Sequence, residues 1–204
     1  GFLRRKDYRR NYGLLRFSPR PAPSHMRGIR KFTYQGTVDY YENTSGRLDT
    51  RESVGEFDID FQNSDRVQAQ YTRNYEFIPQ PFKIASNVTV PVGPYDYQSL
   101  LVGYTGGNQR KIAGQISYEG GTLYEGTKHT LNYSSGRVEV SSRLSFEPTF
   151  SLNWVDLPWG NFTSRVISTR TNITMNPRMF VSALLQYNSS AHSLTSNVRL
   201  RWEY

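Results

Sequence analysis

Three carboxylates at alternate positions are the residues most suited to do chemistry in this chain. Glu56, Asp58 and Asp60 occupy every second position of one segment, so in a β-strand their side chains share one face. Neighbours on such a face lie about 6.5 to 7 Å apart at the backbone. This spacing is compatible with the paired carboxylates of a glycoside hydrolase, with contact to calcium or another cation, or with the charged wall of an aqueous channel. We favour the channel wall and keep the others open.

Other catalytic constellations find no support in the sequence. The chain has no cysteine, which removes thiolate catalysis, disulfides and zinc-thiolate sites together. It has no Gly-x-Ser-x-Gly motif, and its three histidines, His25, His129 and His192, are too far apart in sequence to indicate a zinc motif. We therefore predict no catalytic residue, no cofactor and no metal ligand, and leave open whether the protein is an enzyme.

Aromatic residues make up 14% of the chain, a high fraction for a sequence otherwise so polar. Tryptophan and tyrosine have an apolar ring with a polar tip, which suits the boundary between membrane and water. We expect most of them, including Trp154 and Trp202, to form such a girdle. Trp159 lies in a Pro-Trp-Gly loop and is the best candidate for a ring that contacts a ligand such as a sugar.

The elements that must position these residues are strands. Almost every segment alternates apolar and polar residues with period two, and none keeps the 3.6-residue repeat over an ordinary helix length. No stretch approaches the roughly 18 apolar residues of a membrane helix. We predict an all-β, antiparallel up-and-down meander of about 10–11 strands. Residues 79–94, which contain four prolines, should form its longest irregular connection.

Parity along the chain predicts the pairing of strands, because cross-strand partners must share a face. Apolar residues are odd-numbered on both sides of Asn63, which requires an odd loop. They change from odd to even between Tyr187 and Leu194, which predicts pairs of Met179 with Trp202 and of Val181 with Leu200. The parity also changes within residues 123–140, so we expect a bulge or an extra turn there.

The apolar face of such a meander meets either a protein core or lipid. Sandwiches usually have about seven short strands, whereas the strands predicted here reach the roughly 9 to 11 residues of a tilted membrane crossing. Several polar faces are crowded with charge, which a wet lumen tolerates. We therefore predict part of a transmembrane outer-membrane β-barrel, with a soluble β-sandwich binding module as an alternative.

The net charge of +8 is concentrated near the start of the sequence. Residues 1–31 hold ten Lys or Arg against the single Asp7, and the rest of the chain is nearly neutral. Such a run could contact nucleic acid or anionic headgroups. We predict no nucleic-acid partner, because the run has no recognisable helix, fold signature or base-stacking aromatic platform.

Several phrases of the sequence resemble a large family of bacterial envelope proteins. The most specific are Val-Asp-Leu-Pro at residues 155–158 and Ala-Leu-Leu-Gln-Tyr-Asn at residues 183–188, supported by residues 1–5, 17–21, 75–78 and 197–204. In that family a family-9-type carbohydrate-binding domain precedes a C-terminal domain of unknown function that resembles an outer-membrane β-barrel. Family members are often labelled as hydrolases of glycans, but no catalytic residues carry over to this chain.

The resemblance implies that residues 1–204 are one β-barrel domain, a fragment that lacks the upstream domain and the last strands. The expected partners are outer-membrane lipid, a glycan and the upstream carbohydrate-binding domain of the same protein, and the expected location is the bacterial cell outer membrane. The expected function is a membrane anchor or conduit associated with carbohydrate binding or uptake. The alternative is a glycan hydrolase with lumenal or loop carboxylates. The candidate ligand-binding residues are Trp159, Glu56, Asp58 and Asp60.

Overall fold

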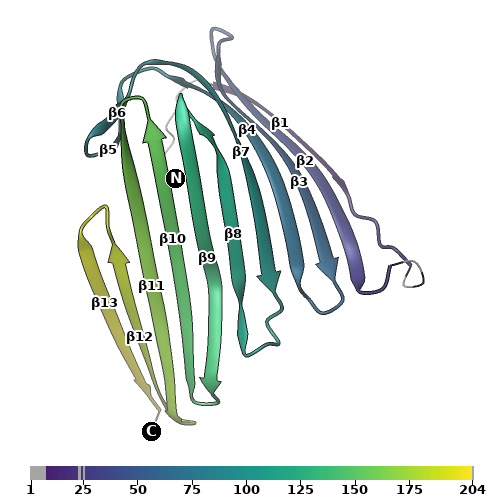
Figure 1. Cartoon of the computed structure of the whole chain (residues 1–204), viewed down its shortest axis with the longest axis vertical. Helices are drawn as coiled ribbons and strands as arrows, with labels where there is room; N and C mark the ends of the chain where they lie inside the picture. Colours follow the sequence, from purple (N-terminus) through teal and green to yellow (C-terminus); the bar gives the residue numbers. More distant parts are fainter. Residues whose placement is uncertain (1–7, 23, 25, 204) are drawn as a thin grey trace.

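The computed structural model describes residues 8–22, 24 and 26–203 of the chain. It is an antiparallel all-β fold that is 78% strand, with no helix among those residues, and so with no helix long and apolar enough to cross a membrane. The strands in chain order (Figure 1) are β1 (Tyr8–Phe17), β2 (Ile29–Asn43), β3 (Leu48–Phe61), β4 (Arg66–Ile78), β5 (Phe82–Ala85), β6 (Val88–Val90), β7 (Gly93–Gly106), β8 (Ile112–Leu123), β9 (Gly126–Ser141), β10 (Leu144–Leu157), β11 (Gly160–Asn176), β12 (Met179–Asn188) and β13 (Ser193–Trp202).

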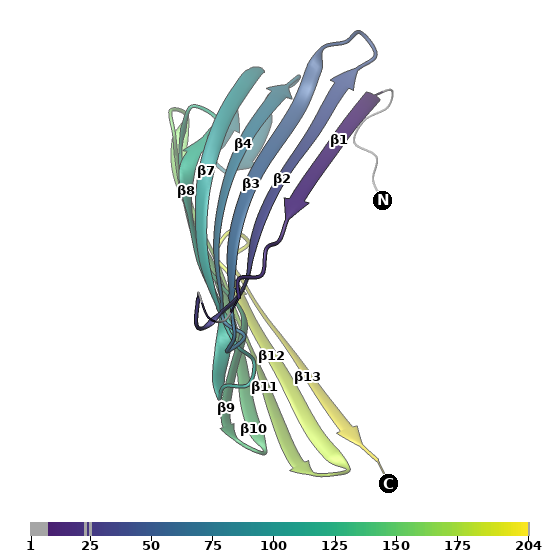
Figure 2. The ribbon, with the colours of Figure 1, turned by 90° about the vertical axis from the view of Figure 1, so that its right-hand side faces the viewer.

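Eleven strands form one continuous meander, as the alternation predicted. Each strand of this sheet pairs with the next one along the chain, except that β4 pairs with β7, and β5 and β6 form a separate two-stranded sheet. The large sheet is twisted and curved (Figure 2). It remains open, with β1 and β13 as its two edges. The structure therefore shows an open meander, and the closed barrel expected from the sequence stays a prediction.

The strand registers agree with the parity argument. Met179 pairs with Trp202 and Val181 pairs with Leu200. At the turn that contains Asn63, Asp60 pairs with Arg66, so an odd number of residues lies between the two partners. The irregular part of residues 123–140 is a bulge: the pairing of β9 shifts against both of its neighbours near Ser135, which has a φ of 51°.

The proline-rich connection differs from the prediction in containing structure of its own. The short hairpin of β5 and β6 lies within residues 79–94 and packs beside β11 (Figure 1). Val88 and Val90 of this hairpin are almost fully buried. They form the small apolar core of the molecule with Ile78, Tyr95, Val155 and Leu157. A four-proline segment can fold in this way because it pairs only with itself.

The two faces of the large sheet differ sharply in composition. The apolar face contains a row that runs through paired residues of eight strands: Phe17, Tyr34, Phe57, Ala69, Val102, Tyr118, Leu131 and Leu152. The adjacent row on the polar face consists of Arg16, Gln35, Glu56, Gln70, Leu101, Glu119, Thr130, Asn153 and Ser164. Leu101 is the only apolar residue in this second row.

Burial is the reverse of what a soluble sheet requires. On the apolar face, Val102, Ile116 and Ile167 are each 47% exposed although they lie in central strands. On the polar face, Asp58, Asp60 and four Thr or Ser side chains are buried: Thr33, Thr72, Ser117 and Thr130. The small core under the hairpin also lies on this face, because Tyr95 and Val155 belong to it by register. Among the described residues, many large apolar side chains of the meander therefore contact only neighbours in the same sheet and stay exposed.

Strand β10 gives the height of the apolar face. Every second residue from Leu144 to Trp154 is apolar, and the next residue of that face is Asp156. The stretch spans about 33 Å at ~3.3 Å per residue. With a strand tilt of ~40° this corresponds to a height of about 25 Å, which is the height of the apolar band on outer-membrane barrels.

Candidate functional site on the polar face

The polar face contains the three carboxylates singled out in the sequence, and they share it as the alternation predicted. Their cross-strand partners are Gln35 for Glu56, Thr33 for Asp58 and Lys31 for Asp60. Strand β4 flanks them on the other side. The carboxylates therefore lie in a strip along β3 with hydrogen-bonding side chains on both neighbouring strands.

Asp60 is held by two close cations, with a third, Arg30 Nη2, farther away at 3.9 Å from Oδ2. Arg66 Nε lies 2.6 Å from its Oδ1, and Lys31 Nζ lies 3.0 Å from its Oδ2. Asp60 is only 2% exposed, so these ion pairs offset the cost of removing its charge from water. A carboxylate fixed in this way stabilises the strand pairing, and it is poorly placed to donate or accept a proton in a reaction.

Asp58 is in a different situation from Asp60. Its closest cation is Arg66, whose Nη1 lies 3.9 Å from Asp58 Oδ2. Its Oδ1 is buried without a hydrogen-bond partner, as are the Oγ1 of its cross-strand neighbour Thr33 and the Oδ2 of Asp60, which contacts Lys31 only as an ion pair. Among the described residues, no group of three or more His, Cys, Asp or Glu side chains could hold a metal ion. The strip fits a charged wall better than a metal centre.

Trp159 does not project freely into solvent. It follows β10 in the turn to β11 and is partly buried against the small core under the hairpin. Its ring meets Tyr95 edge-on, with 6.1 Å between ring centroids and 83° between planes. Packing of this kind holds the indole in place. A contact with a ligand remains a prediction, limited to the part of the ring that is still accessible.

The histidines do not converge. His129 lies on the apolar face, where its Nδ1 is 2.7 Å from the hydroxyl of Tyr118. His192 lies in the turn between β12 and β13 with a φ of 47°. His25 lies outside the described residues. His129 thus pairs with an exposed tyrosine, and His192 lies in a separate turn.

The basic run at the start is described only in part. Arg4, Arg5 and Lys6 lie outside the described residues. Arg10 forms two hydrogen bonds of 2.7 Å with the carboxylate of Asp39. Arg9 bonds to Glu42 at 3.0 Å. These two arginines of β1 therefore stabilise the pairing of β1 with β2.

Two clusters on the polar face were missed at the level of sequence. One is a pocket of about 260 Å³ that includes Tyr41, Glu52, Asn74, Glu76 and Tyr97. The hydroxyl of Tyr97 donates to Glu76 at 3.4 Å. Because its members come from β2, β3, β4 and β7, only the strand registers bring them together. Its aromatic rings and carboxylates are groups that can stack on and hydrogen-bond to a polyhydroxylated ligand.

The other cluster is rich in arginine and lies near the β13 edge of the sheet. A cleft of about 890 Å³ is lined by Arg170, Arg199 and Arg201 against a single carboxylate, Glu147. Arg170 Nη1 lies 3.3 Å from Glu147 Oε2. The alternation in β13 predicts that Arg199 and Arg201 share a face, but their proximity to Arg170 depends on the register of β11, β12 and β13.

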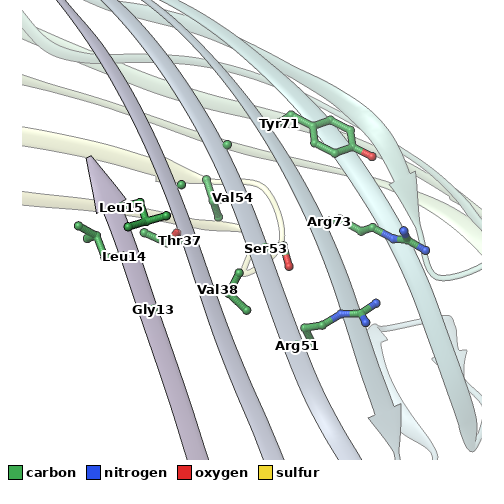
Figure 3. A pocket seen from close by; sticks show the side chains of 12 residues that line it. Gly13, Leu14, Leu15, Thr37, Val38, Arg51, Ser53, Val54, Tyr71 and Arg73 are labelled. Carbon is green, nitrogen blue, oxygen red and sulfur yellow. The ribbon is translucent and has the colours of Figure 1, made fainter. Parts of the chain in front are cut away.

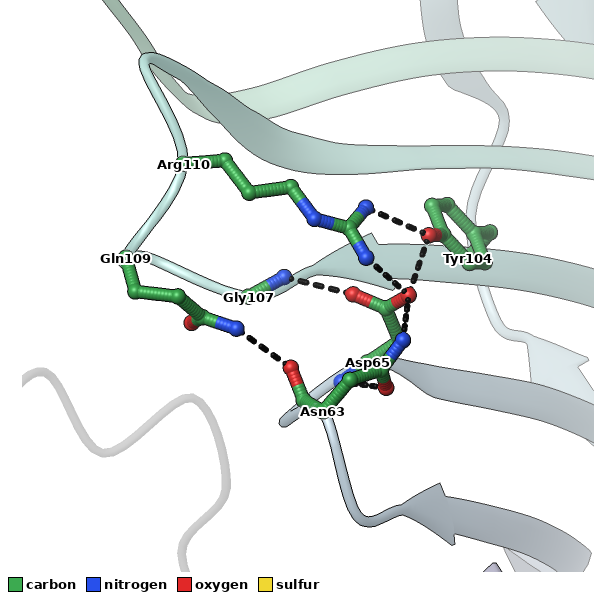
Figure 4. Close-up of polar contacts among 6 residues, drawn as sticks. All are labelled: Asn63, Asp65, Tyr104, Gly107, Gln109 and Arg110. Carbon is green, nitrogen blue, oxygen red and sulfur yellow. Dashed lines mark hydrogen bonds and ion pairs between the residues drawn. The ribbon is translucent and has the colours of Figure 1, made fainter. Parts of the chain in front are cut away.

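A third cluster, also missed, ties two turns together at one end of the sheet (Figure 4). Asp65, between β3 and β4, accepts hydrogen bonds from Gly107 N at 2.8 Å, Tyr104 Oη at 2.8 Å and Arg110 Nη2 at 2.7 Å. The Gly107 hydrogen bond is the main cause that lowers the pKa of Asp65 to about 2, and Tyr104 and Arg110 contribute in the same direction against partial burial. The cluster stabilises the sheet where neighbouring hairpins meet.

Comparison of the chain with protein-family models, with curated proteins and with solved structures finds no match. The family suggested by the resemblance therefore remains a prediction. The arrangement of the two faces is the observation from which a function can be argued.

Proposed function

We propose that this protein is an outer-membrane protein of the β-barrel type, with its apolar face against lipid and its polar face toward an aqueous path. Its location would be the bacterial outer membrane, and its role that of an anchor or conduit. Closure into a barrel belongs to this proposal, since it would remove the unpaired hydrogen-bonding groups on the free edges of β1 and β13, which lipid does not tolerate.

The single observation that carries the proposal is the apolar row across eight strands, in which four residues are exposed and the other four are partly exposed. Val102 and Tyr118 of that row are 47% and 44% exposed in the middle of the sheet. In water such a continuous apolar surface would be a liability for aggregation. In a bilayer the same surface needs no protein partner, and the height of about 25 Å estimated from β10 matches the hydrocarbon band of known barrels.

The composition of the polar face supports the proposal that this face lines an aqueous path. Charged groups such as Asp60, Lys31 and Arg66 pair with one another on the face opposite to the apolar row. A water-filled lumen is the environment in which a membrane protein can keep such groups. The charged strip along β3 would then be part of the lumen wall.

A role in carbohydrate binding or uptake rests on the sequence resemblance, with one supporting feature. The pocket with Tyr41, Tyr97, Glu52 and Glu76 on the polar face combines aromatic rings with carboxylates, a composition suited to a glycan. We include glycan contact in the proposal as the class of solute that would meet this wall.

The hydrolase alternative receives less support from the geometry. Asp60 is occupied by two cations at 2.6 and 3.0 Å, and Asp58 is buried beside it. A retaining or inverting hydrolase needs two carboxyl groups that both reach the glycosidic bond. The soluble sandwich alternative requires two packed sheets, whereas the second sheet among the described residues is the short β5–β6 hairpin.

The first experiment compares the full chain in detergent and in detergent-free buffer. We expect a compact gel band that loses its mobility shift on heating, together with a β-type circular dichroism spectrum, only in detergent or lipid vesicles. A soluble monomer with the same spectrum in plain buffer would contradict the membrane proposal. Conductance in planar bilayers then separates a conduit, which passes current, from an anchor, which does not.

A further inference from the structure

A hollow lies in the apolar face where three glycines on adjacent strands take the place of larger side chains. Its base is formed by Gly13, Gly36 and Gly55, and Leu15, Val38 and Tyr71 are among the residues around it (Figure 3). We call it the glycine hollow. Its volume is about 740 Å³, within the range of small-ligand sites. No atom lies within 4 Å of the position that a Cβ would take on any of the three glycines, so the space above them is open.

The register explains why the hollow forms at this place. Gly36 of β2 pairs with Gly55 of β3, and Gly13 of β1 pairs with Val38, two positions further along β2. Glycine weakens a strand interior because it contributes no side chain to packing. Three glycines on one face of three adjacent strands therefore leave a depression in which a flexible apolar chain can lie.

A charged triad closes one end of the hollow. Arg51 and Arg73 line the hollow and extend side by side from β3 and β4 in Figure 3. Arg73 makes two hydrogen bonds of 3.0 Å to Asp96, and Arg51 Nη2 lies 3.6 Å from the same carboxylate. The triad carries one net positive charge, and all three side chains remain partly exposed.

We propose that the glycine hollow binds one acyl chain of an anionic phospholipid whose phosphate contacts Arg51 and Arg73. The apolar hollow and the arginines at its end match the two parts of such a lipid. Arginine presents several N–H donors in a planar fork that suits phosphate oxygens, and Asp96 occupies only some of those donors. The inference deepens the proposed function and rests on it, because the hollow must face lipid.

The charge of the triad sets the expected selectivity. Near a membrane surface, each net positive charge raises the affinity for an anionic headgroup by about fivefold. With one net charge, the protein should prefer phosphatidylglycerol over phosphatidylcholine with the same chains by about fivefold. Replacement of a cation or of the anion in the triad should change this preference in opposite directions.

The test is a titration of the refolded chain in uncharged detergent with each lipid, followed by native mass spectrometry. Arg51→Gln leaves the Arg73–Asp96 pair intact and should abolish the preference for phosphatidylglycerol. Asp96→Asn adds one net charge and should raise the preference to about 25-fold. Gly55→Leu fills the hollow and should weaken both lipids together.

The outcomes separate this inference from the proposed function. Arg199→Gln on the polar face is the matched control and should leave the lipid preference unchanged. If the chain inserts into bilayers but binds both lipids equally, or if Arg51→Gln and Asp96→Asn change the preference in the same direction, the lipid site is wrong and the membrane proposal stands. If the chain does not insert at all, both are wrong.

Discussion

A pair of adjacent arginine substitutions on β7 distinguishes lipid from water as the neighbour of the apolar face. Val102 lies on the apolar row and is 47% exposed. Leu101 lies on the polar row, between Gln70 and Glu119. Val102→Arg and Leu101→Arg introduce the same side chain one residue apart, so the net charge changes equally in both variants.

The two environments predict opposite rankings. In a bilayer, an arginine on the lipid face near mid-depth costs about 2–4 kcal/mol of folding free energy. Leu101→Arg should cost about 1 kcal/mol there, because lost packing is partly offset by attraction to Glu119. In water, Val102→Arg would be an exposed substitution, within about 0.5 kcal/mol of neutral. Leu101→Arg would then be the more destabilising change.

The assay is urea unfolding of the wild type and both variants in phosphatidylcholine vesicles, with the folded fraction read from heat-modifiable gel mobility. We expect Val102→Arg to unfold at clearly lower urea than Leu101→Arg, with a difference of about 1–3 kcal/mol. Equal stabilities, or a larger loss for Leu101→Arg, would refute the assignment of the apolar face to lipid.

Three further predictions concern positions whose environment is set by the fold. The pKa of Asp65, which lies in a turn outside the proposed membrane segments, is lowered to about 2; its ionised form therefore stabilises the fold above its ordinary pKa near 3.8, and this contribution is lost as the pH falls from about 4 to 2. Asp65→Asn should destabilise the protein at pH 7 and flatten the pH dependence of the urea midpoint between pH 2 and 5; an unchanged profile would contradict the role of the turn cluster. Gly121→Ala would place a Cβ against the backbone of the neighbouring strand, whereas Gly13→Ala meets nothing within 4 Å. The free energy of unfolding, from urea titration, should therefore fall by about 1–3 kcal/mol for the first and stay unchanged for the second. Asp60→Asn removes a carboxylate that pairs with Lys31 and Arg66. In urea titration it should lower the free energy of unfolding by about 1–3 kcal/mol, against less than about 1 kcal/mol for Asp58→Asn. An equal loss in both variants would show that the ion pairs do not distinguish the two sites.

The sequence by itself determined the class of fold and much of the pairing. Period-two alternation is a local property, so it identifies strands and their two faces without knowledge of the rest of the molecule. Parity across a turn is also local, which is why the pairs of Met179 with Trp202 and of Val181 with Leu200 were predictable and are confirmed. The shared face of Glu56, Asp58 and Asp60 follows from the same rule.

Only the tertiary structure decided which residues of different strands meet at the same height. Bulges and long connections shift each strand along its neighbour by an amount that alternation does not reveal. Arg51, Arg73 and Asp96 come from three strands, and nothing within any one of them indicates a triad. The different environments of Asp58 and Asp60 depend in the same way on where Lys31 and Arg66 lie in the neighbouring strands.

The packing of Trp159 is a further example of what distance along the chain conceals. The flanking proline and glycine predicted a surface loop with an accessible ring. In the structure, the core under the hairpin of residues 82–90 partly buries this ring. The hairpin reaches this loop because the meander carries β4 and β11 to the same end of the sheet. Such contacts are long-range consequences of sheet curvature and strand stagger, which the amino-acid pattern of a single segment does not encode.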